Sequence, residues 1–302
     1  DFVSRLRDYI GSNPDKTFIL DVMHGSSGPF IKPFKEGGFE VIRETPISEG
    51  TYPQGPDGLV EVAGSRKPYR PEPLWDLLDK EARNRFKNEA TEGSVYFAID
   101  GDGDRFAAWI IRNGEVISLR PDKSAVLFGW YDLKKGLTPG KYVQRTQPTT
   151  RALDAIVEWA NKSRSLDEQL ELIVTPVGSK HFGPFITETV LGAEESGHLV
   201  VRGVFDDGTV QAMFLSDIMM DLDKSPIEAI EQAEGEVGYS EETARVNTDL
   251  TDELKGQIVG QLQSDPWQLV QSLERNAGKK IAEVTVTDCT EDDGRIITLE
   301  EL

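Results

Sequence analysis

Apolar residues in the first part of the chain follow a helical spacing and then gather into short runs. The spacing of Phe2, Leu6 and Ile10 predicts a helix over 1–11, and a second helix is predicted over 72–90. Short apolar runs predict strands at 16–23, 39–42, 94–99 and 106–111. Strands that alternate with helices are typical of an α/β fold with parallel strands, whose ligands bind at the carboxyl ends of the strands.

The pattern restarts after Asn113-Gly114 and predicts a second α/β unit over about 119–235. Its predicted helices cover 121–134, 150–161 and 209–222, and its predicted strands cover 142–144, 170–175, 189–191 and 199–201. The fold class we predict is α/β, with two consecutive α/β domains whose sheets are mixed and mainly parallel.

Two other stretches differ from these units in composition or in the pattern of predicted elements. Prolines and glycines concentrate over 46–73, which predicts a surface loop rather than a helix or a central strand. Beyond residue 236 we expect a partial α+β segment. It is predicted to hold a strand or an extended link at 237–246, helices at 250–262 and 267–273, and strands at 281–286 and 296–299.

Composition places the chain among ordinary globular proteins, with 38% hydrophobic and 28% charged residues in 302. The net charge of −20 argues against a nucleic acid or an anionic membrane as partner. No apolar run approaches the roughly 18 residues of a membrane span. The single cysteine, Cys289, cannot form an internal disulfide, which suits a reducing compartment, and we expect a cytoplasmic protein.

The strongest chemical signal is the loop Asp-Gly-Asp-Gly-Asp-Arg, in which Asp100, Asp102 and Asp104 alternate with glycines and Arg105 follows. Glycine lets the backbone bend tightly, so the three carboxylates can converge. Like charges about 4 Å apart repel by roughly 4 kcal/mol at an effective dielectric near 20, so convergence requires a cation. Carboxylate oxygens suit Mg²⁺ or Ca²⁺ rather than Zn²⁺.

This loop has two other possible interpretations. An EF-hand needs glycine at its sixth position and glutamate at its twelfth, but those positions hold Arg105 and Ile111, which excludes it. A solvated acidic turn at a hairpin tip stays open. Arg105 counts against such a turn, because a cation beside a cation site makes sense when both face a phosphate.

A second polar loop follows in the later unit. Glu194, Ser196 and His198 alternate, so in an extended segment they would face one side and could bind sugar hydroxyls. A polar hairpin turn without a ligand stays an alternative. Asp206-Asp207-Gly208 precedes a predicted helix and is expected to cap it. The turn 24–28 is expected either to bind an anion or to be a plain tight connection.

The acidic loop, followed by Glu194-Glu195-Ser196-Gly197-His198, resembles the α-D-phosphohexomutases, specifically the phosphoglucomutase/phosphomannomutase group. The resemblance covers about residues 1 to 235 well and the rest loosely. Supporting segments occur in the same order at Asp21–Gly25, Pro56–Gly58, Pro71–Pro73 and Thr175–Lys180.

The resemblance implies the middle of a four-domain enzyme. Residues 1–118 would be domain 2 with the metal-binding loop, 119–235 domain 3 with the sugar-binding loop, and 236–302 an incomplete start of domain 4. In the family, a phosphoserine in domain 1 donates its phosphoryl group to a hexose phosphate, and a bisphosphate intermediate turns over. A hexose 1-phosphate and a hexose 6-phosphate are thereby interconverted, with glucose favoured here and mannose a second choice.

The resemblance also implies roles for individual residues. Asp100, Asp102 and Asp104 would hold Mg²⁺, and Arg105 would neutralise phosphate charge. The sugar would be bound by Glu194, Ser196 and His198, with Gly178 and Lys180 helping to set its orientation. A phosphohexomutase and a non-catalytic module that binds a sugar phosphate or a divalent cation are the two functions to compare.

The chain departs from the family pattern in two places. The serine loop T-A-S-H-N-P and the phosphate-binding loop R-P-S-G-T-E-P do not occur in it. Since the nucleophile would lie outside this chain, no catalytic residue is predicted within it. The 302 residues alone are expected to be inactive, as a fragment that lacks domain 1 and the rest of domain 4 of the parent chain.

Overall fold

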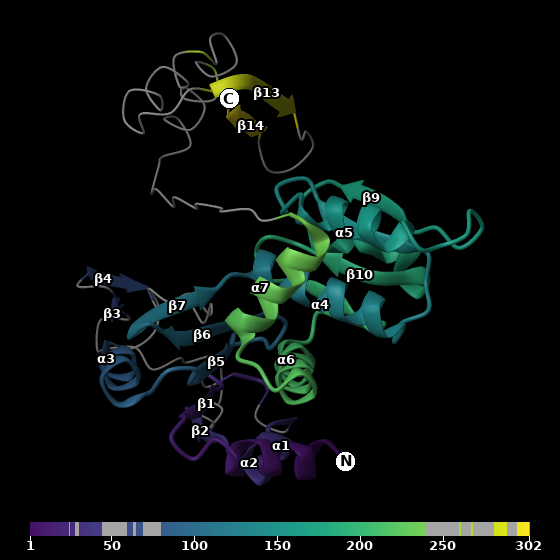
Figure 1. Cartoon of the computed structure of the whole chain (residues 1–302). Helices are drawn as coiled ribbons and strands as arrows, with labels where there is room; N and C mark the ends of the chain where they lie inside the picture. Colours follow the sequence, from purple (N-terminus) through teal and green to yellow (C-terminus); the bar gives the residue numbers. More distant parts are fainter. Residues whose placement is uncertain are drawn as a thin grey trace.

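The computed structural model describes residues 1–23, 25–27, 30–43, 59–62, 65–68, 80–239, 260, 267, 281–288 and 295–301. Within them the chain forms two five-stranded sheets with helices on their faces, and two separate two-stranded sheets (Figure 1). The predicted α/β class with two consecutive mixed sheets is confirmed. None of the helices in these ranges combines the length and the apolarity that crossing a bilayer requires.

The first unit is built on a sheet with the strand order β2-β1-β5-β6-β7. Strands β2, β1 and β5 run parallel, whereas β6 and β7 are added antiparallel. Its elements are α1 (Phe2–Gly11), β1 (Phe18–Asp21), α2 (Lys32–Gly37), β2 (Glu40–Ile42), β3 (Leu59–Val62), β4 (Ser65–Pro68), α3 (Lys80–Glu89), β5 (Val95–Ile99), β6 (Phe106–Arg112) and β7 (Glu115–Leu119).

The sequence of strand β5 is a continuous run of hydrophobic residues. All five of its residues are buried, because both faces of the sheet are covered. Val95 and Phe97 face one hydrophobic cluster, and Tyr96 faces another, where its ring meets that of Phe86 of α3 at 5.5 Å. The carboxyl end of this strand is therefore a stiff base for the loop that follows.

The second unit repeats the plan with the order β12-β11-β10-β8-β9, in which β10, β8 and β9 run parallel. Helices α4 and α5 contact these strands, and so does a 3₁₀ helix, η4. Its elements are α4 (Pro121–Lys135), β8 (Tyr142–Thr146), α5 (Ala152–Asn161), β9 (Glu171–Thr175), η4 (Ser179–Glu188), β10 (Thr189–Ala193), β11 (Leu199–Val201), β12 (Val204–Phe205), α6 (Gly208–Leu222) and α7 (Pro226–Val237).

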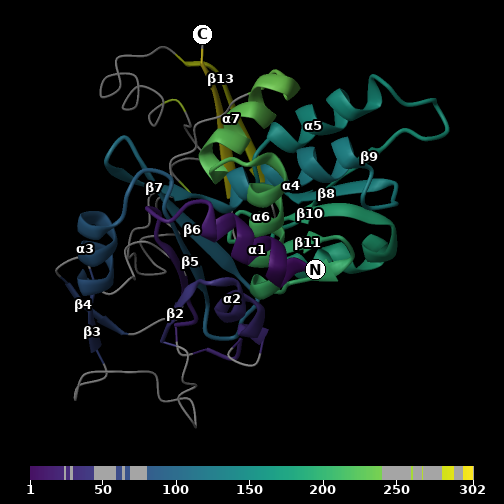
Figure 2. The same ribbon diagram turned by 60° about the horizontal axis from the view of Figure 1, so that its bottom comes forward.

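The two units share one hydrophobic core. A single buried cluster includes Phe18 and Phe97 of the first sheet together with Val143 and Leu199 of the second. Helix α6 contacts α1 and strands β5 and β6, and α7 contacts β6, so helices of the second unit cover part of the first (Figures 1 and 2). Apolar side chains therefore pack across part of the junction between the units.

The structure departs from the predicted elements in several places. The proline-rich stretch includes an antiparallel hairpin of β3 and β4, a local pair outside the central sheet. Helix α7, η4 and β7 were not predicted, and the predicted extended link is wrong at Val237, which ends α7 before Gly238 takes a φ of 77°. Each five-stranded sheet has as many antiparallel as parallel pairings.

Other predictions fall partly or wholly outside the described residues. The helix predicted over 72–90 is described from Lys80 to Glu89. The predicted helices at 250–262 and 267–273 lie outside the described ranges apart from residues 260 and 267. The last two predicted strands are confirmed as the hairpin β13 (Ile281–Asp288) and β14 (Arg295–Glu301).

Candidate functional site

The acidic loop connects β5 to β6 as the tip of an antiparallel hairpin, since Ile99 pairs with Phe106. Asp100 is fully buried there. Its Oδ1 accepts hydrogen bonds from the backbone N–H groups of Gly103 and Arg105 at 3.1 Å each, and Arg105 Nε donates to its Oδ2 at 2.7 Å. A buried carboxylate with three donors is unlike a solvated acidic turn.

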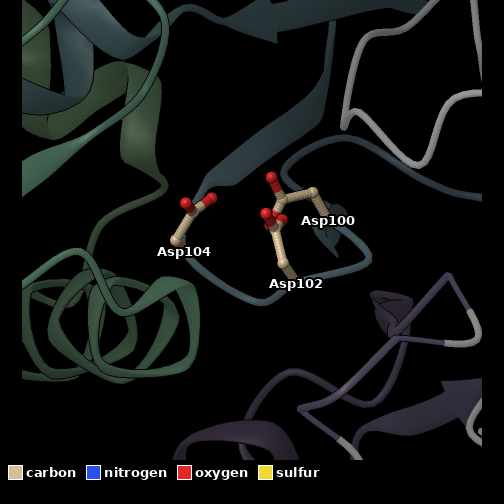
Figure 3. A group of neighbouring side chains, drawn as sticks. All are labelled: Asp100, Asp102 and Asp104. Atoms are coloured by element: carbon tan, nitrogen blue, oxygen red, sulfur yellow. The ribbon is translucent and has the colours of Figure 1, made fainter. Parts of the chain in front are cut away.

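The three carboxylates converge as the sequence predicts. Asp100, Asp102 and Asp104 each offer an oxygen, and these oxygens lie within 4.8 Å of one another. Figure 3 shows the three side chains grouped along one short loop. Burial raises the pKa of Asp100 to about 7, although the hydrogen bonds and the charge of Arg105 act in the opposite direction. Among the described residues, Oδ1 of Asp104 is buried and accepts no hydrogen bond, although Arg105 Nε lies 3.5 Å away.

The described part of the turn 24–28, residues 25–27, supports this loop from within the first unit. The N–H of Ser26 donates to the carbonyl oxygen of Gly101 at 2.9 Å, and its hydroxyl donates to that of Asp102 at 2.6 Å. A Cβ on Gly25 would lie 2.7 Å from the carbonyl oxygens of Asp100 and Gly101, so the approach requires glycine. The turn thus braces the acidic loop, while His24 and Gly28 lie outside the described residues.

The second unit holds the same loop from the other side. The backbone N–H of Gly208 donates to the carbonyl oxygen of Gly103 at 2.8 Å. Asp207 caps α6 as predicted, accepting from the N–H groups of Thr209 and Val210. Sequence reasoning found this cap but missed the contact with the acidic loop, because the two segments are far apart in the chain.

The loop that contains Glu194, Ser196 and His198 is a turn between the antiparallel strands β10 and β11. The expected extended segment is therefore wrong. The N–H of Glu194 donates to the carbonyl oxygen of His198 at 2.9 Å, and Gly197 adopts a φ of 106°. Glu194 is buried, and the hydroxyl oxygen of Ser196 is buried with no hydrogen bond to any described residue. A turn brings the three polar groups close together without relying on alternation.

The two loops meet at the junction of the units. His198 Nδ1 lies 3.7 Å from Asp104 Oδ2 and 3.3 Å from Asp206 Oδ2. Burial opposes protonation of His198, but the nearby carboxylate of Asp206 raises its pKa above the usual value. The charges of Asp104 and Glu194 add to that rise. The acidic and the polar loops therefore form one continuous charged and polar surface.

Gly178 and Lys180 are placed near the second loop by the topology of the sheet. Strands β8, β9 and β10 are parallel, so their carboxyl ends share one edge. Gly178 follows β9 with a φ of 114° and precedes η4, on which Lys180 is exposed. Glu194 follows β10 at the same edge.

Comparison with known proteins gives a family model, a curated relative and solved structures that resemble this chain. Residues 120–234 match the family model described as phosphoglucomutase/phosphomannomutase, alpha/beta/alpha domain III. A phosphomannomutase/phosphoglucomutase of Pseudomonas putida KT2440 is 27% identical over 252 residues, which cover 82% of this chain and 48% of that protein. The chain thus spans about half the length of the curated relative that it matches.

Two of the solved structures that resemble this chain align along its full length. A provisionally named phosphomannomutase of Thermus thermophilus aligns with a TM-score of 0.61 at 19% identity, covering 100% of this chain and 57% of that one. The open form of the phosphoglucomutase pp63/parafusin of Paramecium aligns with a TM-score of 0.60 at 19% identity, covering 100% of this chain and 50% of that one.

Proposed function

We propose that the chain is a member of the phosphoglucomutase/phosphomannomutase family and that it supplies the metal-binding and sugar-binding parts of a phosphohexomutase. The parent protein would interconvert a hexose 1-phosphate and a hexose 6-phosphate, with glucose favoured over mannose. One observation carries this proposal more than any other. A loop of three carboxylates from the first unit touches a loop of polar side chains from the second, through Asp104 and His198.

The residues of the acidic loop fit a divalent cation. Three carboxylate oxygens lie within 4.8 Å of one another, and they are the hard ligands that such a cation prefers. Among the described residues, Oδ1 of Asp104 is buried and accepts no hydrogen bond, although Arg105 Nε lies 3.5 Å away. We propose that Asp100, Asp102 and Asp104 hold Mg²⁺. When bound, the ion would supply positive charge to offset that of a transferring phosphoryl group.

Arg105 and the second loop would handle the substrate itself. Nε of Arg105 is bonded to Asp100, which fixes the guanidinium beside the acidic loop, where it would neutralise phosphate charge. Glu194, Ser196 and His198 would bind sugar hydroxyls, and the hydroxyl of Ser196 is buried without a hydrogen bond among the described residues. Gly178 and Lys180 would set the orientation of the sugar from the same sheet edge.

Phosphoryl transfer depends on alignment and charge stabilisation more than on covalent chemistry from the protein. We propose that a sugar hydroxyl attacks the phosphorus of a phosphoserine elsewhere in the parent, which gives a bisphosphate and frees the serine oxygen. The other phosphoryl group then returns to that oxygen. The intermediate must be held in two orientations during this cycle. Polar side chains that bind sugar hydroxyls suit this requirement, because they can pair with different hydroxyls in each orientation.

The domain assignment belongs to the same proposal. Residues 1–118 would be domain 2, 119–235 domain 3 and 236–302 the start of domain 4. The match of residues 120–234 to a domain III family model supports the two boundaries proposed for domain 3. The serine loop T-A-S-H-N-P and the phosphate-binding loop R-P-S-G-T-E-P do not occur in these 302 residues. We therefore propose that this chain alone binds ligands without turning them over.

Calorimetric titration of the 302-residue chain with Mg²⁺ tests the metal site, after prior removal of metals by a chelator. We expect one site, lost in Asp102→Asn, whose exposed side chain can be changed with the fold intact. Asp167→Asn, an exposed change of the same charge outside the loop, is the matched control. Equal binding by the two variants would show that the acidic loop is no metal site.

Titration with glucose 1,6-bisphosphate in the presence of Mg²⁺ tests the sugar site. Binding that is weakened by Ser196→Ala supports it, and an unaltered affinity contradicts the role of the second loop. A mutase assay on the same purified chain should show no interconversion of glucose 1-phosphate and glucose 6-phosphate. Turnover would refute the proposal that the nucleophile lies outside this chain.

A further inference from the structure

Asp206 is the acidic residue that faces His198 from its own unit. Its Oδ2 lies 3.3 Å from His198 Nδ1, closer than Asp104 Oδ2 of the first unit at 3.7 Å. The side chains of His198 and Asp206 are only 21% and 13% exposed, so water competes weakly for this contact. At 3.3 Å the contact is slightly longer than most hydrogen bonds from nitrogen to oxygen, so a small rotation of either side chain would form one.

The backbone around Asp206 is fixed on both sides. Its N–H donates to the carbonyl oxygen of Leu199 at 3.0 Å, and its φ of 46° lies in the left-handed region. Asp207 caps α6, and the N–H of Gly208 is bonded to Gly103 of the acidic loop. The carboxylate of Asp206 is therefore presented from a rigid support rather than from a free loop.

A neutral imidazole has one nitrogen that donates and one that accepts, and the partner of one nitrogen decides the role of the other. A carboxylate can only accept. We propose that Asp206 is a positioning residue that keeps the proton of His198 on Nδ1, so that Nε2 accepts a hydroxyl of the hexose phosphate. The hydroxyl contact rests on the proposed function, whereas the position of the proton does not.

Asp104 is less suited to this role, although it also faces Nδ1. Its carboxylate belongs to the acidic triad, so a bound cation would draw on the same oxygens. Asp206 lies outside that triad and can hold the ring with or without a metal. Glu194 also acts on His198 through its charge.

The position of the proton can be read by NMR in the intact chain. Long-range ¹H–¹⁵N correlation at alkaline pH reports the tautomer of each neutral imidazole, and there are only three histidines, so His24→Gln and His181→Gln assign the spectrum. We expect the Nδ1–H form for His198. Asp206→Gly, which tolerates the left-handed backbone, should shift it towards Nε2–H, and Asp206→Asn should give an intermediate result.

Asp207→Asn is the matched control, because it removes the same charge one residue away and keeps an effective helix cap. It should leave the tautomer of His198 unchanged. An Nδ1–H form that persists in Asp206→Gly overturns the inference. So does a shift that Asp104→Asn causes and Asp206→Gly does not.

Titration with glucose 1,6-bisphosphate and Mg²⁺ supplies the second measurement. The dissociation constant should rise about tenfold in Asp206→Gly and stay within about twofold in Asp207→Asn, as for partners that orient a ligating histidine elsewhere. If the unaltered chain binds no sugar phosphate, the proposed function is wrong. The tautomer measurement still decides whether Asp206 positions His198.

Discussion

The backbone N–H of Gly208, at the start of α6, donates to the carbonyl oxygen of Gly103 in the acidic loop at 2.8 Å. This bond joins the second unit to the candidate metal site of the first. A Cβ at position 208 would lie 2.4 Å from the carbonyl oxygen of Arg105, so the contact is open only to glycine.

Gly208→Ala should therefore force the acidic loop and α6 apart. We expect a loss of about 1–3 kcal/mol in the free energy of unfolding, as for overpacked cores, together with weaker Mg²⁺ binding. Urea denaturation and calorimetry measure the two effects. Gly235→Ala is the control, because that glycine lies within α7 with no atom near its missing Cβ. It should raise stability by about 0.5–1 kcal/mol. Equal effects of the two changes would contradict the close contact at Gly208.

The continuous core predicts that the two units unfold together. Phe97 of β5 and Leu191 of β10 belong to one buried cluster. Amide hydrogen exchange in β5 and in β10 should therefore report the same free energy of opening. Protection that is lost in one sheet at a lower denaturant concentration than in the other would show two independent domains.

A buried acid in the first unit predicts the effect of removing one hydroxyl. Asp21 is fully buried and accepts hydrogen bonds from the hydroxyl of Tyr96 at 2.5 Å and from Arg43 Nε at 2.8 Å. Tyr96→Phe should lower the free energy of unfolding by about 1.5–3 kcal/mol, the usual range for a bond to a charged group. Tyr142→Phe is the control, since the hydroxyl of Tyr142 has no hydrogen bond in the described part of the chain. Similar stability losses in both variants would contradict a special role for Tyr96.

The capping box of α7 predicts a pH effect. Hydrogen bonds from the hydroxyl and the backbone N–H of Ser225 lower the pKa of Glu228, and Arg112 adds to that effect. A lowered folded-state pKa gives stability that is fully present above the unfolded value of about 4.3 and is lost as the pH falls through the folded value.

Glu228→Gln should therefore cost stability at neutral pH, and the difference from the unaltered chain should shrink as the pH falls below about 4.3. The effect is small, because the side chain of Glu228 is 47% exposed. Urea midpoints between neutral and acidic pH measure it, and Ser225→Ala should flatten the same part of the curve. A difference that widens in acid would contradict this assignment.

The sequence predicts well those elements whose own residues carry the signal, either as a run of apolar side chains or as a capping residue. Val95 to Ile99 are all apolar because both faces of β5 are covered, and Asp1 and Asp207 precede their helices as caps. Helix α7 was missed, although Ser225, Pro226 and Glu228 carry a readable capping box and a proline at the first turn.

The site was predictable in its residue types and less so in its geometry. The three aspartates converge as predicted, because glycines separate them within one short loop. The roles of Asp206 and Gly208 were not predictable, since their partners lie in other segments and nothing in the local pattern identifies them. The alternation of Glu194, Ser196 and His198 suggested an extended segment, whereas Gly197 turns the chain there.

The bond from Gly208 to Gly103 also couples the assembly of the two halves to the shape of the candidate cation site. A polypeptide cut between β7 and α4 would carry all three aspartates in its first half but not the N–H that holds their loop. Chelation strength would then report how far the halves have reassociated, and added Mg²⁺ would drive them together by mass action. The affinity of the acidic loop for Mg²⁺ would then depend on whether the second half is bound.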